Sequence, residues 1–304
     1  MAPLSVTVRV PAKVNLHLGV GPLRPDGKHQ LHTVYQAISL YDEVTLEPSD
    51  DGSLDVELVG EYVDGVPTGA DNLAVQAVRA VAALAGVPPA VRVRLRKGIP
   101  VAGGLAGGSA DAAAALVAAD ALWRCGLDRE SLERLAAGLG SDVAFLLHGG
   151  TALGTGTGEI VSPVMSQGEW HWVLAVADSG LSTPTVYAEL DRRRGEDAGS
   201  AELSLADGVV AALRAGDVVA LGRGLRNDLQ QPALQLRPNL ARVLAVGREL
   251  GAAGGIVSGS GPTVALLAPS SGEAIRIASA LAGYDVCRTV RRASGPVAGA
   301  RIIA

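Results

Sequence analysis

The chain has 304 residues, of which 48% are hydrophobic and 19% charged, and its formal net charge is −5. A chain of this length and composition is expected to form about two globular domains, and it does not fit the disordered class. The acidic balance argues against a protein that works by neutralising the nucleic-acid backbone, so small anionic ligands are the better expectation, despite the local basic strip Arg92, Arg94, Arg96 and Lys97.

Cys125 and Cys287 lie far apart with no histidine or second cysteine at ligand spacing. The sequence therefore indicates neither a zinc site nor a disulfide framework. The first 15 residues show no charged start followed by an apolar run, and no segment reaches the ~18 apolar residues of a membrane span. We expect a cytoplasmic protein without a membrane partner.

The first half of the chain is predicted to combine short strands with helices. A helix is predicted over 71–86, because Asp71 can cap its start and Gly86 can end it. The predicted strands cover 5–10, 42–47, 54–60 and the residues from Ala90 to Ile99. Further helices are predicted after Gly108, over 127–140 and from Ser141, the last leading into a glycine-punctuated strand.

A glycine-rich segment separates the strand that begins at Ala90 from an alanine-rich helix. Residues 97–116 read KGIPVAGGLAGGSADAAAAL, and Ser109 is placed to cap the first turn of the helix. Glycine loses more backbone entropy on folding than any other residue, so a dense glycine loop should have a use that offsets its cost. Free N–H groups at a helix N-terminus bind phosphate, and glycines allow it to approach the main chain closely. A tight strand-to-helix turn is the alternative, but it needs only one or two glycines.

The spacing of this segment excludes two common phosphate loops. A Walker A loop would end in Gly-Lys-Ser/Thr, whereas Gly108 is followed by Ser109 and Ala110. A dinucleotide fingerprint ending at Gly104 and Gly107 would need a glycine where Ala102 stands.

A boundary between two domains, 1–158 and 159–304, is predicted near residue 158. After it, residues 254–268 form two apolar runs around a Ser-Gly-Ser-Gly turn. Strands are predicted over 171–177, 285–292 and 300–304, the last two completing one sheet, and helices over 183–192, 205–215, 239–250 and 272–283. Segments 177–182 and 192–202 are predicted to be mobile loops. Strands and helices without steady alternation favour an α+β protein.

Three separated blocks resemble the motifs of the GHMP small-molecule kinases. They are PAKVNLHL at 11–18, PVAGGLAGGSADAAAAL at 100–116 and GIVSGSGPTVALL at 255–267. The resemblance implies a two-domain fold, with a ribosomal-protein-S5-domain-2-like N-terminal domain and a ferredoxin-like α/β-plait C-terminal domain. It also implies that the third block closes the back of the phosphate site with backbone amides, although a hairpin turn between core strands would look the same.

Within this family, residues 11–18 together with 24–44 and 140–159 are most similar to members that act on a cytidine-linked alcohol. The resemblance implies transfer of the ATP γ-phosphoryl group, with Mg²⁺, to the 2-hydroxyl of 4-diphosphocytidyl-2-C-methyl-D-erythritol in non-mevalonate isoprenoid biosynthesis. The resemblance also implies that the glycine loop forms the ATP site. This site comprises Lys97, Pro100, Val101, Ala102, Gly103, Gly104, Leu105, Ala106, Gly107, Gly108, Ser109 and Ala110. Ser109 would touch phosphate or Mg²⁺; no set of metal-ligating side chains is predicted.

The resemblance places Asp142 on the family's catalytic carboxylate and Lys13 on its lysine partner. A base near the attacking hydroxyl and a cation that neutralises developing charge are what phosphoryl transfer requires. The alternatives are a helix N-cap for Asp142 and a solvated charge for Lys13. Asn15 is implied to line the substrate hydroxyl region, on the same strand face as Lys13, and a turn asparagine is its alternative.

For the cytosine base, the resemblance implies hydrogen bonding by His29 and stacking by Tyr187, with Thr183 nearby. The alternatives are a loop histidine with backbone partners and a tyrosine packed in the core. Lys28 stands where members usually carry an aromatic residue, so one stacking ring is missing unless the lysine stem or ammonium covers the base. This predicts weaker or less selective cytidine binding.

Two other functions remain open at this level. One is another GHMP kinase, acting on an alcohol such as homoserine or mevalonate. The segment around His29 and Tyr187 disfavours this function. The other is a non-catalytic nucleotide- or nucleic-acid-binding module, which the acidic charge and the presence of both Lys13 and Asp142 disfavour. We expect no nucleic-acid partner, and a monomer or a weak homodimer.

Overall fold

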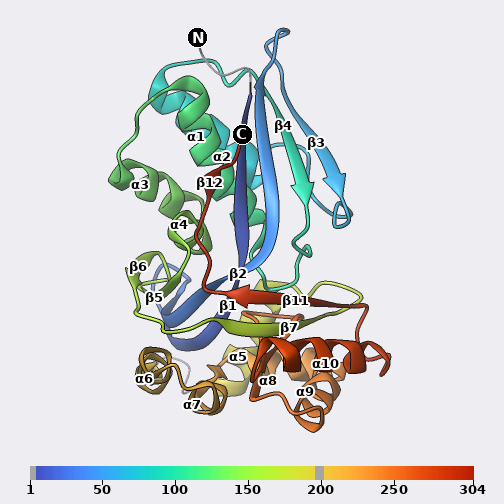
Figure 1. Ribbon diagram of the computed structural model, residues 1–304. Coiled ribbons are helices and arrows are strands. Elements are labelled where there is room, and N and C mark those ends of the chain that lie inside the picture. The colour runs from blue at the N-terminus through green and yellow to red at the C-terminus, as the bar shows by residue number, and fades with distance from the viewer. Residues whose placement is uncertain (1–4, 196–201) are drawn as a thin grey trace.

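The structure is a computed structural model that describes residues 5–195 and 202–304, and it is organised by two β-sheets (Figure 1). Within these residues, the first sheet has the strand order β12-β1-β2-β4-β3, with β5 on β2, β6 on β5 and β8 on β1, and the second has the order β11-β7-β10-β9. The strands are β1 (Val6–Leu23), β2 (His29–Pro48), β3 (Leu54–Gly60), β4 (Val91–Lys97), β5 (Thr151–Thr155), β6 (Ile160–Pro163), β7 (Trp170–Val176), β8 (Arg226–Asn227), β9 (Gly254–Val257), β10 (Val264–Ala268), β11 (Thr289–Gly295) and β12 (Arg301–Ile302).

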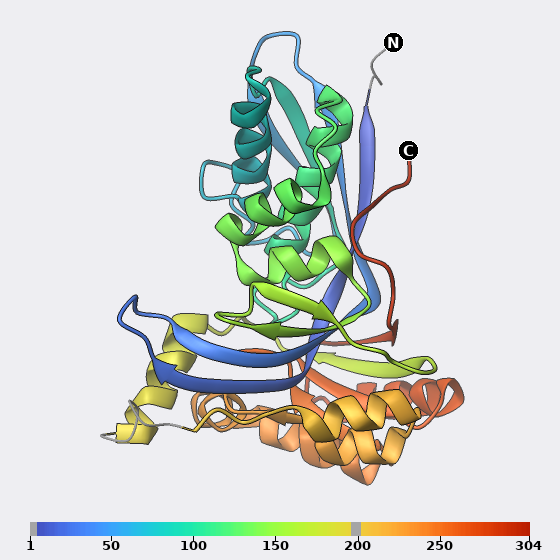
Figure 2. The same ribbon diagram turned by 90° about the vertical axis from the view of Figure 1, so that its left-hand side faces the viewer.

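The antiparallel pair β1 and β2 forms a long ribbon that reaches from the upper part of the molecule to the second sheet (Figure 2). Strand β1 has 18 residues and β2 has 20, so the strands predicted over 5–10 and 42–47 are only their outer ends. The register shifts between Pro11 and Ala12, and again between Asn15 and His17. Such bulges bend a strand and redirect its side chains. The residues 11–18 therefore lie inside the bent strand, beside the functional cavity described below.

Four helices cover one face of the first sheet (Figure 1). They are α1 (Leu73–Ala85), α2 (Gly107–Trp123), α3 (Arg129–Leu139) and α4 (Ser141–His148). All the alanines of α2 except Ala121 are buried in the main core, where their small side chains permit close approach to the sheet and to α1.

The ends of α1 test two predicted caps. Gly86 caps its C-terminus with a left-handed φ of 67°, which confirms the predicted end. The predicted N-cap Asp71 is wrong. Asn72 is the extended residue directly before the helix, and its side-chain oxygen accepts from the N–H of Ala74 at 2.8 Å.

The second sheet and its helices form the lower half of the molecule (Figure 1). All its strand pairs are antiparallel, and numbering its own four strands in chain order gives the spatial order fourth, first, third and second. This is the order of a ferredoxin-like plait, as predicted. A second core joins the sheet to helices that cover its outer face. The helices of this half are α5 (Thr183–Arg194), α6 (Asp207–Ala215), α7 (Val218–Gly224), α8 (Gln230–Leu236), α9 (Asn239–Glu249) and α10 (Ser271–Ala282).

The C-terminal strand corrects one prediction. Residues 300–304 were expected to complete the second sheet, but β12 pairs with β1 of the first sheet, with Ile302 opposite Val8. The chain thus returns to cover an edge that would otherwise expose unpaired backbone groups. The strand predicted over 285–292 begins only at Thr289, because the chain turns at Asp285, where φ is 50°.

The predicted domain boundary at residue 158 falls in the turn between β5 and β6, and strand pairing with the first sheet continues to Pro163. The boundary itself stays a prediction.

The loop predicted over 192–202 is helical up to Arg194, and residues 196–201 lie outside the described residues. Among the described helices, none is both long and apolar enough to cross a membrane.

Candidate active site

A cavity of about 520 Å³ lies where the N-terminus of α2 meets the second half of the molecule. Strand β1, the glycine loop, α4, α5 and the turn between β9 and β10 all contribute to its wall, which brings together most of the residues predicted from sequence. It is lined by Lys13, Asn15, Leu18, Leu31, Tyr35, Leu73, Ala102, Gly103, Gly104, Ala106, Gly107, Gly108, Ser109, Asp142, Leu181, Ser182, Thr183, Pro184, Tyr187, Leu229, Gly259, Ser260 and Gly261.

The glycine loop presents free backbone donors to this cavity. The N–H of Ala110 donates to the carbonyl of Ala106 at 2.8 Å, so the N–H groups of Gly107, Gly108 and Ser109 precede the first intrahelical bond of α2. These donors and the helix dipole favour an anion. The predicted capping role of Ser109 is wrong, because α2 already begins at Gly107 and has no side-chain cap.

The turn between β9 and β10 packs directly against the glycine loop. Ser258 Oγ donates to the carbonyl of Gly104 at 3.0 Å, and the N–H of Thr263 donates to the carbonyl of Gly103 at 3.2 Å. Gly104 has a φ of +76°, and a Cβ there would stand 2.0 Å from the Ser258 carbonyl oxygen. The third motif is therefore a hairpin turn that also supports the loop, and Gly259–Gly261 line the cavity.

Lys97 does not line the cavity, which corrects its predicted nucleotide contact. Along β4, buried and exposed residues alternate, and the alternation turns Lys97 inward while Arg92, Arg94 and Arg96 face outward. Lys97 is fully enclosed and forms ion pairs with Asp42 and, at 2.6 Å, with Asp111. Two residues of the outward strip are paired, Arg94 with Glu57 and Arg96 with Glu43.

The buried triad of Lys97, Asp42 and Asp111 ties together both ends of the loop. Asp42 Oδ1 accepts from the N–H groups of Gly98 at 2.6 Å and Ile99 at 2.9 Å, where the loop begins. Asp111 lies in the first turns of α2, where the loop ends. Burial raises the pKa of Asp111 to about 8, because Lys97 offsets only part of the burial cost and Asp42 adds repulsion.

Lys13, Asn15 and Asp142 meet on one side of the cavity. Lys13 Nζ lies 3.7 Å from Asp142 Oδ2 and donates to Asn15 Oδ1 at 2.6 Å. The Lys13 side chain is 5% exposed and that of Asp142 is 30% exposed, so Lys13 is not a solvated surface charge. Asp142 is not the helix N-cap, because Gly140 holds that position.

Tyr35 is a site residue that the sequence analysis missed. Burial, followed by the charge of Asp142 and a hydrogen bond to it, raises the pKa of Tyr35 well above its usual value. The phenol therefore stays protonated beside Asp142, and Lys13 Nζ lies 6.0 Å from the ring centre. The local sequence offers no signal for this role, because residues 33–38 are all buried without alternation and nothing in them pairs Tyr35 with Asp142.

A second cavity of about 560 Å³ adjoins the first through shared walls at Leu31, Thr183, Pro184 and Tyr187. Lys28 and His29 also line it. The rings of His29 and Tyr187 stack with their centres 5.3 Å apart and their planes at 27°. Thr183 Oγ1 lies 2.8 Å from Ser260 Oγ, which joins α5 to the turn behind the glycine loop. All the residues predicted for the base thus lie at this second cavity.

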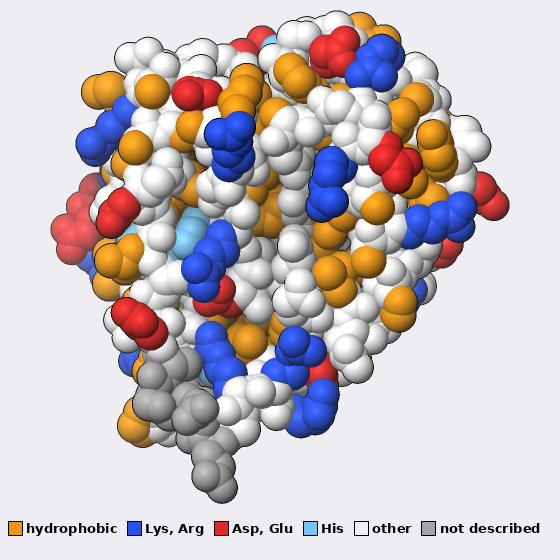
Figure 3. All heavy atoms as spheres, turned by 90° about the horizontal axis from the view of Figure 1, so that it is seen from below, with side chains coloured by type: hydrophobic (Ala, Val, Ile, Leu, Met, Phe, Trp, Pro, Cys, Tyr) orange, Lys and Arg blue, Asp and Glu red, His pale blue; other side chains and the backbone are white. Residues whose placement is uncertain are grey.

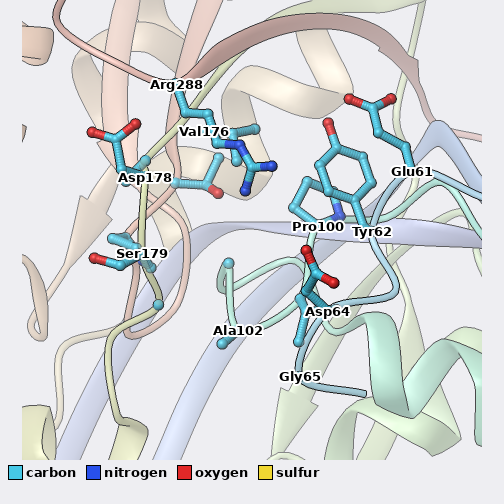
Figure 4. A pocket seen from close by; sticks show the side chains of 16 residues that line it. Glu61, Tyr62, Asp64, Gly65, Pro100, Ala102, Val176, Asp178, Ser179 and Arg288 are labelled. Atoms are coloured by element: carbon cyan, nitrogen blue, oxygen red, sulfur yellow. The ribbon is translucent and has the colours of Figure 1, made fainter.

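A third cavity, of about 350 Å³, lies on the other side of Pro100–Gly103 (Figure 4). Tyr62, Asp64, Asp178 and Arg288 surround it, and it shares Ala102 and Gly103 with the first cavity. The start of the glycine loop is therefore a thin wall between two spaces, held by its contacts with the turn between β9 and β10.

No group of three or more His, Cys, Asp or Glu residues able to hold a metal ion occurs in the described part of the chain. On the face seen from below, Lys and Arg side chains are interspersed with Asp and Glu (Figure 3). That face therefore lacks the single-sign basic surface that nucleic-acid backbone binding favours.

Comparison with known proteins agrees with this geometry. The family model described as "GHMP kinases N terminal domain" matches residues 72–150, and "GHMP kinases C terminal" matches residues 209–285. Two relatives are named 4-diphosphocytidyl-2-C-methyl-D-erythritol kinase. The Salinispora arenicola protein is 59% identical over 97% of this chain and 93% of its own length. The Mycobacterium tuberculosis protein is 55% identical over 98% of this chain and 93% of its own length.

Solved structures of GHMP kinases also resemble this chain over nearly its whole length. A crystal structure of 4-(cytidine 5'-diphospho)-2C-methyl-D-erythritol kinase is 34% identical, has a TM-score of 0.75 and covers 95% of this chain and 98% of its own. A homoserine kinase from Cytophaga hutchinsonii has a TM-score of 0.76 at 20% identity, covering 99% and 98%, and shows the shared fold. With both family models matched and relatives more than half identical over nearly the whole length, the chain belongs to the GHMP kinase family.

Proposed function

We propose that this protein transfers the γ-phosphoryl group of ATP to the 2-hydroxyl of 4-diphosphocytidyl-2-C-methyl-D-erythritol. The observation that carries the proposal is the Lys13–Asp142 pair, 3.7 Å apart, in the same cavity as the free N–H groups at the start of α2. The adjoining cavity with Tyr187 and His29 supports a cytidine-linked acceptor. The relatives with 59% and 55% identity bear the name of this activity.

In the proposed reaction, the glycine loop and the N-terminus of α2 hold the phosphates of the donor. Asp142 accepts the proton of the attacking hydroxyl, which is typically worth ~10²–10⁴ in rate. Lys13 neutralises charge that develops between the hydroxyl and the phosphoryl group. Asn15 holds Lys13 in place through its side-chain oxygen, and its amide donates to Thr33 Oγ1 at 2.9 Å.

The residues at the phosphate end of the cavity fit Mg²⁺ bound mainly through substrate. Mg²⁺ usually takes few protein ligands and keeps phosphate oxygens and water around it. Of the predicted residues, Ser109 lies in the first turn of α2 and lines the cavity, and we propose it as the protein contact of the ion. When bound, Mg²⁺ would neutralise charge on the donor phosphates.

A small alcohol such as homoserine or mevalonate is the less favoured acceptor. The solved homoserine kinase resembles this chain at 20% identity, which indicates a common fold only. The second cavity, with its stacked ring and its volume of about 560 Å³, provides space that so small an acceptor would leave empty.

The test is coupled ADP release with ATP, Mg²⁺ and 4-diphosphocytidyl-2-C-methyl-D-erythritol. We expect turnover by the natural protein and a loss of ~10²–10⁴-fold in kcat for Asp142→Asn, with ATP binding retained. Glu130→Gln, which removes a carboxylate of the exposed pair with Arg134, is the control and should leave turnover unchanged. Absence of turnover by the folded natural protein would shift the proposal to another alcohol.

A further inference from the structure

The ring of Tyr35 is held in one place by the elements around it. Tyr35 is only 2% exposed, and its ring stacks on that of the buried Phe145 of α4, with the centres 4.9 Å apart and the planes at 22°. Strand β5 and the turn after it pack against the same ring. A Cβ on Gly154 would stand 2.6 Å from Cε2 of Tyr35, and a Cβ on Gly158 would stand 2.7 Å from its hydroxyl oxygen. Since only glycine permits so close an approach, the hydroxyl has a fixed position.

That position is beside the start of α4. The Cβ that Gly158 lacks would also stand 3.2 Å from Cβ of Ser141, the residue directly before Asp142. Ser141 Oγ donates at 2.8 Å to a carbonyl of the turn that contains Gly158, which ties this turn to the helix. Phe145 follows Asp142 by three residues, so both side chains lie on one face of α4. Tyr35 therefore meets α4 through the ring of Phe145 and through the carboxylate of Asp142.

The rest of the site does not orient the carboxylate of Asp142. Lys13 Nζ lies 3.7 Å from its Oδ2, which is within the range of an ion pair but longer than a hydrogen bond. Lys13 donates instead to Asn15. The Asp142 side chain is 30% exposed, so burial alone does not hold it. A phenol that donates to a carboxylate forms a charge-assisted hydrogen bond, which is short and roughly twice as strong as a neutral one.

We propose that Tyr35 is a positioning residue, whose hydroxyl donates to one oxygen of Asp142 and leaves the other oxygen directed at the acceptor hydroxyl. The proposal rests on the proposed function, because it assigns Tyr35 a task within that reaction. Burial raises the pKa of Tyr35 well above its usual value, so the hydroxyl keeps its hydrogen throughout the neutral range. A base held in this way is already oriented before the reaction begins, and a misplacement of about 1 Å can cost on the order of 10²-fold in rate.

The experiment is a double-mutant cycle on kcat with Tyr35→Phe and Asp142→Asn. Tyr35→Phe keeps the ring that stacks on Phe145 and removes the hydroxyl alone. We expect it to lower kcat about 10- to 100-fold and to leave KM for both substrates within about twofold, because orientation of the base acts on the chemical step. In the Asp142→Asn background the same substitution should change kcat by less than about twofold, since the oriented base is absent there.

Tyr41→Phe is the matched control. Tyr41 also lies on β2 but is not part of the cavity wall, so its variant should keep the natural kcat. A second readout needs no turnover: the Asp142 carboxyl signal in protein labelled with carbon-13 at aspartate Cγ, identified by its absence from Asp142→Asn. Loss of a hydrogen-bond donor changes this signal, so it should move in Tyr35→Phe and stay in place in Tyr41→Phe.

An equal loss of kcat from Tyr35→Phe in both backgrounds, or an unmoved Asp142 signal, would overturn the positioning role and leave Tyr35 as a packing residue of α4. A raised KM with unchanged kcat would also overturn it, because the hydroxyl would then contact substrate and not the base. Absence of turnover by the natural protein, with the Asp142 signal still moved in Tyr35→Phe, would overturn the proposed acceptor and support the contact between Tyr35 and Asp142.

Discussion

At the scale of single residues, Lys28 stands where the family resemblance implies an aromatic residue. It lies in the turn between β1 and β2 and lines the second cavity together with Tyr187. Its side chain forms no ion pair with any residue in 5–195 or 202–304. A lysine stem covers a base less completely than a ring does, and its ammonium must give up part of its hydration to do so.

We therefore expect Lys28→Tyr to bind CDP about tenfold more tightly, since stacking on an aromatic ring contributes roughly 1–3 kcal/mol per base. Titration calorimetry with CDP would measure the change. Lys28→Met keeps a flexible stem without charge or ring and serves as the matched control. Unchanged CDP affinity in Lys28→Tyr would show that the missing ring has no effect on the base.

At the scale of elements, the glycine loop is held by a buried charge triad. Lys97 ends β4, Asp42 lies in β2, and Asp111 lies in α2, so one cluster fixes the strand before the loop and the helix after it. Within the triad two carboxylates face one ammonium ion in the core, which is unfavourable unless one carboxyl holds a proton. This explains why burial raises the pKa of Asp111.

The raised pKa of Asp111 predicts a pH dependence of folding stability. An unfolded Asp titrates near 3.9, whereas the folded pKa is about 8, so between these values the folded state holds a proton that the unfolded state has lost. The contribution of this group to stability therefore falls as pH rises from about 4 to about 8, with a slope on the order of 1 kcal/mol per pH unit, and is level above that range.

Asp111→Asn should remove this slope, because the amide stays neutral and can still accept from Lys97. Urea unfolding of both proteins at several pH values between 5 and 9 would measure it. Glu130→Gln, at an exposed pair with Arg134, should keep the natural slope. Parallel curves for Asp111→Asn and the natural protein would mean that Asp111 is ionised throughout this range.

At the scale of the whole molecule, the two sheets share one core. Trp172 of β7 is fully buried, and its indole N–H donates at 2.9 Å to Gln36 of β2. The Gln36 amide in turn donates to Thr151 Oγ1 at 3.2 Å, and all three residues are buried. Apolar residues of both sheets belong to the main core. We therefore expect the two halves to unfold together, in a single cooperative transition.

Trp172→Phe should lower the free energy of unfolding by about 2 kcal/mol, because it leaves the buried Gln36 oxygen unpaired. Trp170→Phe is the matched control on the same strand. Its indole donates only to Ser166, a local and partly buried partner, so its effect should be smaller. Circular dichroism and tryptophan fluorescence should give coincident transitions in both variants. Separate transitions would show that the halves are independent.

Local sequence patterns were sufficient to predict much of the secondary structure and many of the site residues of this protein. The helix end at Gly86, the helix after the glycine loop and the α+β class follow from short-range backbone preferences. The family motifs also identified the residues that meet in the two cavities, including Lys13, Asp142 and Tyr187. The predictions of elements succeed because helix-ending glycines and apolar periodicity act within a few residues along the chain, whereas the caps predicted at Asp71 and Ser109 were wrong.

Only the tertiary structure decided the features that depend on distant partners. The alternation along β4 turns Lys97 away from the cavity and toward Asp42 and Asp111. Residues 300–304 pair with β1 because that edge, and not the second sheet, lies beside the returning chain. Tyr35 became a site residue because the fold brings it to the same cavity as Asp142, over 100 residues away along the chain. Burial, charge pairing and sheet edges are set by three-dimensional neighbours, which no local pattern in one sequence specifies.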